Sequence, residues 1–182
     1  MEMTLDIHSR QLNLLLAPRE ITRQLSAVCT VRLALAGPVL VLDGGNCFDA
    51  RKIATLLRRQ TSRLETILER IYVARAFTCY QMVALLAETH LDHKPTLILE
   101  LLATFQDENV ALPERQRLLQ QSLLLLRHLS SQAAVLVTVC TLSSQYSGSL
   151  METLTASADQ IWRFEAAAAP VLQPGLWSKD ST

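Results

Sequence analysis

The residues best suited to metal or redox chemistry are four cysteines and two neighbouring histidines. The cysteines lie far apart and form no C-x-x-C pair (Cys29, Cys47, Cys79 and Cys140). With no secretory apolar segment at the start of the chain, this pattern predicts reduced thiols and an intracellular protein. His90 and His93 come just before Pro95, where a solvated loop is commoner than a metal site. We therefore expect neither a metal nor another cofactor.

Charge gives little indication of a partner, because 17 Lys and Arg balance 17 Asp and Glu over 182 residues. No apolar run approaches the ~20 residues of a membrane span. One cationic cluster is a candidate for nucleic acid, but Glu65 and Glu69 neighbour two of its arginines. We interpret it as a solvated, internally paired face, and expect nucleic acid to bind weakly or only through a complex. The candidate DNA contacts are Arg51, Lys52, Arg58, Arg59 and Arg63.

Five short apolar runs without polar alternation are typical of strands buried on both faces. They are Leu12 to Leu16, Val39 to Leu42, Ile71 to Ala74, Thr96 to Leu99 and Ala134 to Val139. A sixth strand with exposed polar positions is predicted over Gln160 to Phe164. Helical patterns fill the intervals at Pro18 to Leu35, Ala50 to Arg70, Tyr80 to Thr89 and Pro113 to Ser130.

The alternation of these elements predicts a three-layer α/β fold, with a mainly parallel sheet flanked by helices. Pro18 and Pro113 fall at first-turn positions, and Gly37 with Pro38 ends the first helix. No repeat or internal linker interrupts the pattern. We expect one domain over residues 1–165 and a partly flexible tail over 166–182.

Three segments together resemble the ATPase core of the RecA-type recombinases, especially the archaeal and eukaryotic strand-exchange proteins and their paralogs. They are V-L-V-L-D-G-G-N-C-F-D-A-R-K-I from Val39, I-Y-V-A-R-A-F from Ile71, and L-P-E-R-Q from Leu112 leading to Val135 to Leu142. Their order and spacing run together over roughly residues 12 to 165. The resemblance implies a RecA-like domain of the P-loop class.

The nucleotide machinery that the resemblance implies is absent at several positions. The strand-to-helix connection L-L-L-A-P-R-E-I, Leu14 to Ile21, has no glycine and no G-K-[ST], so it is too short to cradle a triphosphate. Gly45, two residues after Asp43, occupies the position of the family's catalytic Glu. A glycine cannot act as a general base. Its Mg²⁺-binding Asp falls at Glu100, and its sensor Gln at Thr141. We expect ATP hydrolysis to be lost.

The segments at the positions of the family's two DNA-contacting loops lack the basic residues that neutralise phosphate. Gln106 to Ala111 is acidic, and Ser143 to Ser149 has no Lys or Arg. The A-R-A-F segment is preserved, and in the recombinases its small alanines receive a phenylalanine-bearing segment of a neighbour. The resemblance thus implies a partner-binding surface, with close packing of a helix as the structural alternative. Its candidate residues are Ala74, Ala76, Phe77, Met82, Val83 and Leu86.

The leading hypothesis is a non-catalytic accessory or scaffold in DNA recombination or repair. It would bind a RecA-type ATPase or itself. One alternative is a regulatory subunit that completes a nucleotide site in trans through Arg75 or Arg115. Another is an architectural protein unrelated to DNA, because fold does not imply function.

Overall fold

The computed structural model describes residues 5, 7, 10–89, 93–141 and 148–165. His90, the loop residues 143–147 and the predicted tail 166–182 lie outside the described residues. The elements, in chain order, are β1 (Leu12–Ala17), α1 (Arg19–Ala36), β2 (Val39–Asp43), α2 (Ala50–Arg58), α3 (Leu64–Leu68), β3 (Ile71–Arg75), α4 (Cys79–Glu88), β4 (Thr96–Leu99), the 3-10 helix η1 (Leu101–Phe105), α5 (Leu112–Ser130), β5 (Val135–Cys140), α6 (Gly148–Ser157) and β6 (Gln160–Arg163).

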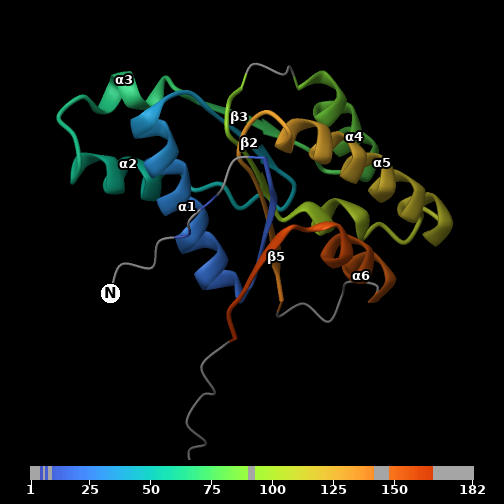
Figure 1. Ribbon diagram of the computed structural model, residues 1–182. Coiled ribbons are helices and arrows are strands. Elements are labelled where there is room, and N and C mark those ends of the chain that lie inside the picture. The colour runs from blue at the N-terminus through green and yellow to red at the C-terminus, as the bar shows by residue number, and fades with distance from the viewer. Residues whose placement is uncertain (1–4, 6, 8–9, 90–92, 142–147, 166–182) are drawn as a thin grey trace, which may run out of the picture.

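The sheet is parallel throughout, in the order β3-β2-β4-β5-β1-β6. Helices α1, α2 and α3 cover one face, and α4, α5 and α6 cover the other, so the fold has three layers (Figure 1). This confirms the predicted α/β class with a sheet flanked by helices. In the part of the chain that the structure describes, no helix is both long and apolar enough to cross a membrane.

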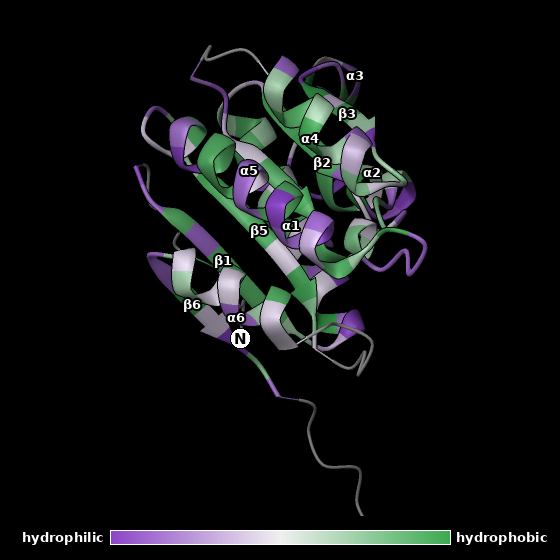
Figure 2. Ribbon diagram, turned by 90° about the vertical axis from the view of Figure 1, so that its right-hand side faces the viewer, coloured by the Kyte–Doolittle hydropathy of each residue, from purple (hydrophilic) through white to green (hydrophobic). Residues whose placement is uncertain are grey.

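Each face of the sheet has its own hydrophobic core, as the hydrophobic colour of the central strands in Figure 2 indicates. Leu14 and Leu16 point to the α4–α5–α6 side, whereas Leu15 and Ala17 point to the α1 side. Because both sets are buried, β1 reads as a continuous apolar run rather than an alternating one. Burying each such leucine contributes roughly 1.5–3 kcal/mol.

The single helix predicted over Ala50 to Arg70 is wrong, because the structure divides it into α2 and α3. The break falls at Thr61, whose hydroxyl accepts a hydrogen bond from the backbone N–H of Arg63 at 3.0 Å. Such local side-chain bonds compete with helical ones. The apolar stripe survives the break, since Ile53, Leu57 and Ile67 are all buried under α1.

The last strand is fixed to the rest of the sheet by Asp159. Its Oδ2 accepts a hydrogen bond from the backbone N–H of Leu12 at 2.7 Å. Its two carboxylate oxygens also accept from Arg127 Nη1 at 2.8 and 3.0 Å, and Arg127 Nη2 donates to the carbonyl of Ser157 at 2.7 Å. The Leu12 N–H first, and then Arg127, hold the pKa of Asp159 below its usual value.

We expect Asp159→Asn to lower the melting temperature at neutral pH, because it removes the charge that binds Arg127 and Leu12. A carboxyl with a lowered folded-state pKa stabilises the protein above its unfolded pKa of about 3.9, and this contribution is lost as the pH falls through the folded pKa. The difference from wild type should therefore shrink below about pH 4. Thermal melts from pH 3 to pH 7 measure it.

The control is Glu152→Gln, which removes an exposed carboxylate on α6. It should melt like wild type across the same pH range. A constant difference between Asp159→Asn and wild type at every pH would contradict the electrostatic role of Asp159.

Candidate functional site

The candidate site is the edge of the sheet at the carboxyl ends of the strands, where open α/β sheets bind ligands. The connection from β1 to α1 is here the single residue Pro18, since β1 ends at Ala17 and α1 begins at Arg19. The Thr22 hydroxyl closes this turn by donating to the carbonyls of Ala17 and Pro18, at 3.0 and 3.2 Å. The prediction of a short connection without a glycine loop is confirmed.

Glu100, at the end of β4, is the most constrained residue of this edge. Its backbone is left-handed, with φ 54° and ψ 54°, and only 9% of the residue is exposed. Its Oε2 accepts a hydrogen bond from the backbone N–H of Cys140 at 2.8 Å, and its own N–H donates to Thr138 Oγ1 at 3.1 Å. The carboxylate at the expected metal-ligand position therefore ties β4 to β5.

Gly45 lies against this glutamate. A Cβ atom added to Gly45 would stand 2.5 Å from Glu100 Cβ and 2.7 Å from Glu100 Cγ. The neighbouring Gly44 is nearly as confined, with Met82, Thr104 and the Glu100 carbonyl all 3.0 Å from an added Cβ. A residue with a side chain, including a catalytic glutamate, does not fit at Gly45 unless Glu100 moves.

Asp43 holds the loop that carries these glycines. Its carboxylate is buried and accepts hydrogen bonds from the backbone N–H groups of Cys47 and Phe48, both at 3.0 Å. Arg75 Nε approaches Asp43 Oδ2 at 3.3 Å from β3. The structure thus brings Asp43, Gly45 and Glu100 together, but as a hydrogen-bonded edge whose groups bind one another.

Thr141, the expected sensor position, lies beside β1 rather than within this group. Its backbone N–H donates to the carbonyl of Ala17 at 3.0 Å, and the residue is exposed. In the described ranges, no three His, Cys, Asp or Glu side chains gather in a way that could hold a metal ion.

Behind the loop, a small cleft lies between α1 and the start of α2, with an interior volume of only about 10 Å³, which is room for about one water molecule. Its polar lining includes Arg23, Cys47 and Ser26, and the Ser26 hydroxyl is buried with no hydrogen-bond partner in the described residues. Burial raises the pKa of the Cys47 thiol, and the carboxylates of Asp43 and Glu100 raise it further, while Arg23 opposes them. The thiol is therefore protonated and unreactive at neutral pH.

No periodicity or motif indicated this cleft in the sequence, because it forms where α1 and the loop after β2 meet. Burial likewise raises the pKa of Cys29, one turn along α1 from Ser26, to about 11.

The predicted partner surface is only partly exposed. Ala76, Met82, Val83 and Leu86 are buried in the core between α4 and the sheet, so the expectation that they face a partner is wrong. Ala74 is half-buried against the same core, and Phe77 is 70% exposed. Enlarging Ala76 would overpack this core, at roughly 1–3 kcal/mol.

Three further exposed side chains, near Phe77 in the sequence, were not predicted: Tyr72, Val73 and Tyr80. The amino group of Lys94 lies 5.0 Å from the centre of the Tyr72 ring, and the Tyr80 hydroxyl lies 3.4 Å from Glu114 Oε1. With Phe77 they form what we term the β3-edge surface, along the outermost strand.

Both arginines proposed to act in trans make contacts within their own chain. Arg75 pairs with Asp43, and Arg115 Nη1 donates to the carbonyl of Phe105 at 3.2 Å.

A search against protein-family models and a search among curated proteins both find no match to this chain.

We expect Gly45→Ala to destabilise the fold by roughly 1–3 kcal/mol, because the new methyl group would overlap Glu100 and force the loop away from β4. The matched control is Gly37→Ala, since nothing lies within 4 Å of a Cβ added there. Urea denaturation measures both free energies of unfolding. Equal stability of the two variants would show that the loop can move away from Glu100 without loss.

Proposed function

We propose that this protein is a non-catalytic, RecA-like accessory or scaffold protein in DNA recombination or repair, which binds a RecA-type ATPase or a second copy of itself. The observation that carries this proposal is the connection between β1 and α1. A phosphate-binding loop wraps its ligand with successive backbone N–H groups and a lysine, whereas here one proline joins the strand to the helix.

The arrangement of the other motif positions supports the RecA-like assignment. The resemblance places nucleotide-binding groups after the first, second, fourth and fifth strands. The structure sets these four strand ends side by side, in the order β2-β4-β5-β1. At that shared edge, Gly45 replaces a base and Glu100 is bound to the backbone of Cys140. Such an edge stabilises the fold and offers no general base at Gly45.

The β3-edge surface supports a role in binding. Val39 N–H donates to the carbonyl of Arg70, and Ala76 N–H donates to the carbonyl of Asp43, at the two ends of the pairing between β2 and β3. Backbone N–H groups along a strand point alternately to its two sides. Between these two bonds, the N–H groups of Tyr72 and Ala74 therefore point to β2, and those of Ile71, Val73 and Arg75 point away from the sheet. An unpaired strand edge beside exposed aromatic rings is suited to accept a partner's extended segment.

Exposed aromatic side chains are also the residues that most often anchor protein interfaces. Phe77 and Tyr80 lie at the start of α4, directly after β3. Because Arg75 and Arg115 are held within their own chain, a subunit that supplies an arginine to a partner's nucleotide is the weaker alternative.

The isolated protein should not bind Mg-ATP. Isothermal titration calorimetry tests this directly, with a RecA-type ATPase as the positive control under the same conditions. A thermal-shift assay is the cross-check, because a ligand at one hundred times its dissociation constant stabilises a protein by about 2.7 kcal/mol. Micromolar binding by either method would return the protein to the nucleotide-binding class.

Val73→Pro should abolish association with the partner while leaving the sheet intact, because it removes an N–H that points away from β2. Val73→Ala removes the same side chain but keeps the N–H, so it should retain at least part of the binding. The readout is recovery of a RecA-type ATPase by affinity purification from the native host, and sedimentation velocity for self-association. Equal binding by both variants would exclude strand addition at this edge.

A further inference from the structure

We propose that the face formed by α2 and the α2–α3 connection binds the phosphate backbone of a nucleic acid. The five cationic residues of this face are Arg51, Lys52, Arg58, Arg59 and Arg63, and we call it the α2–α3 basic face. The proposal does not rest on the partner interaction, which uses the β3-edge surface.

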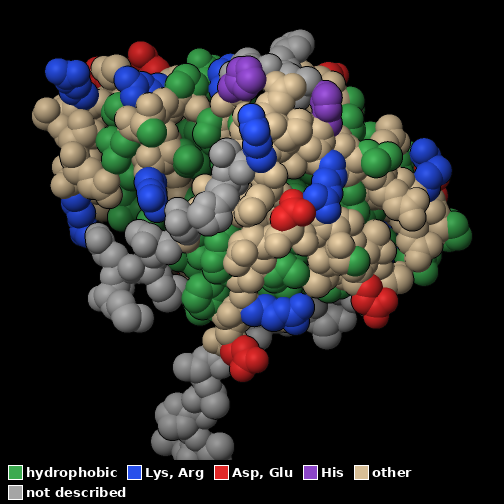
Figure 3. Space-filling view, viewed as in Figure 1, with side chains coloured by type: hydrophobic (Ala, Val, Ile, Leu, Met, Phe, Trp, Pro, Cys, Tyr) green, Lys and Arg blue, Asp and Glu red, His purple; other side chains and the backbone are tan. Residues whose placement is uncertain are grey.

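The charge of this protein is unevenly distributed along the chain. Residues 50–75 contain seven Lys or Arg and two Glu, a formal charge of +5, so the remainder of the neutral chain carries −5. Figure 3 shows several Lys and Arg side chains over α2 and α3, and others spread across the same face of the molecule. A positive region of this kind attracts polyanions, whatever the net charge of the whole protein.

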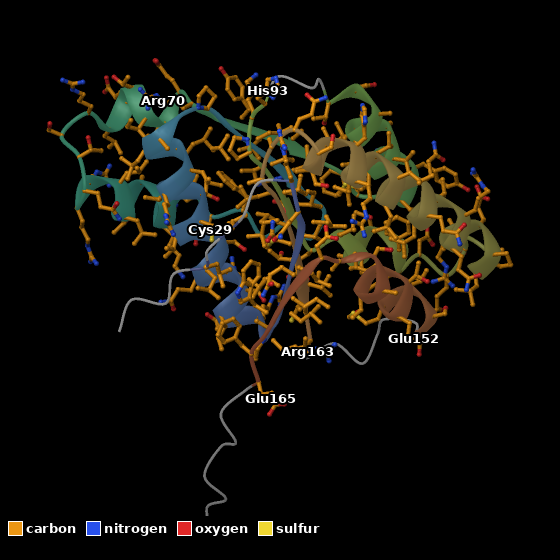
Figure 4. All side chains as sticks on the ribbon, viewed as in Figure 1. Cys29, Arg70, His93, Glu152, Arg163 and Glu165 are labelled. Atoms are coloured by element: carbon orange, nitrogen blue, oxygen red, sulfur yellow. The ribbon has the colours of Figure 1, made fainter. Side chains whose placement is uncertain are left out.

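Two of the seven cations in this segment already have partners in the fold. Arg70 Nη1 donates to the carbonyls of Ala34 and Leu35, both at 3.3 Å, at the end of α1 (Figure 4). Arg75 pairs with Asp43. Among the residues that the structure describes, the side chains of the five residues of the basic face form neither a hydrogen bond nor an ion pair, and Glu65 and Glu69 do not pair with them either.

The interpretation of this cluster as an internally paired face is therefore wrong. The spacing is the physical reason, because neither Glu65 nor Glu69 stands three or four residues from an Arg or Lys of this face, and only at those spacings do helical side chains meet. Arg58, Arg59 and Arg63 are exposed around the break between α2 and α3, together with the polar side chains of Gln60 and Ser62. Arg51 lies two helical turns from Arg58, about 10 Å along the axis of α2.

The surroundings of these cations favour phosphate over a protein or a membrane. Within the described residues, the exposed large hydrophobic side chains are found elsewhere, at Tyr72, Val73, Phe77, Tyr80, Leu112 and Leu124. The apolar residues Ile53 and Leu57 of α2 are buried, so the helix has no apolar side to insert into lipid. Protein interfaces need such apolar anchors, whereas phosphate contacts need only arginine, lysine and hydroxyl or amide groups.

The expected binding is weak, sequence-independent and sensitive to salt. With five phosphate contacts, the slope of the logarithm of the association constant against the logarithm of the salt concentration would be no steeper than about −4.5 for duplex DNA. Non-specific binding of this kind has dissociation constants of about 10⁻⁴ to 10⁻⁶ M at physiological salt. Among the described residues, no exposed aromatic ring lies on this face to stack on bases, so single-stranded DNA should bind no more tightly than duplex DNA.

Fluorescence anisotropy with a labelled 20-base-pair duplex and a labelled 20-nucleotide single strand, titrated from 25 to 200 mM salt, tests the proposal. Arg58→Glu with Arg59→Glu should weaken binding at least tenfold and reduce the salt slope by about 2. Arg58→Lys with Arg59→Lys should keep most of the binding, because both charges remain. The matched control is Arg19→Glu with Arg163→Glu, the same change of charge at exposed residues elsewhere, which should alter affinity less than threefold.

Two results would overturn the proposal. One is DNA binding that falls equally in the control and in the Arg58 and Arg59 glutamate variant, because the effect would then be one of net charge. The other is binding to phosphatidylserine vesicles with none to either DNA, which would make the face a membrane contact. Association with the ATPase partner, measured on the same variants, should be unchanged, so failure here is distinguishable from failure of the proposed function.

Discussion

The close approach of Gly45 to Glu100 is the contact on which the carboxyl edge of this sheet depends. Glu100 can turn into the left-handed region and reach the backbone of Cys140 only because the residue facing it has no side chain. Asp43 then fixes the loop through the N–H groups of Cys47 and Phe48. The loop after β2, the end of β4 and the end of β5 are thereby joined into one hydrogen-bonded unit.

This unit has a consequence for how the protein can interact. A parallel sheet that is covered by helices on both faces leaves its strand ends and its two outer strands for binding. Here the carboxyl ends of the strands are largely occupied by internal bonds, so the outer strands and the helical surface remain, and of the two outer strands β3 is the one with exposed large hydrophobic side chains. The β3-edge surface offers main-chain groups and aromatic rings, and the α2–α3 basic face offers unpaired charge. They lie next to each other in the chain but suit different ligands.

Much of the fold could be predicted from the sequence, because strands buried on both faces appear as continuous apolar runs and α1 is closed by Gly37. What could not be predicted depends on contacts between distant residues. The apolar run that begins at Ile71 has the same pattern as the runs of the buried strands, although β3 is an outer strand of the sheet. The order of strands in a sheet has no local signature in the sequence. The sequence therefore predicted Tyr72 in the core, whereas the resemblance to the recombinases placed Ala76 at a partner-binding surface; the structure reverses both. The contact of Gly45 with Glu100 likewise joins residues 55 positions apart, which no motif records.

The formal charge of this protein is unevenly divided, with +5 in residues 50–75 and −5 in the remainder, although its net charge is zero. In the field of a polyanion, this division favours approaches in which the α2–α3 basic face comes first. The pI of 6.9, which by itself suggests indifference to charged partners, conceals this directional behaviour.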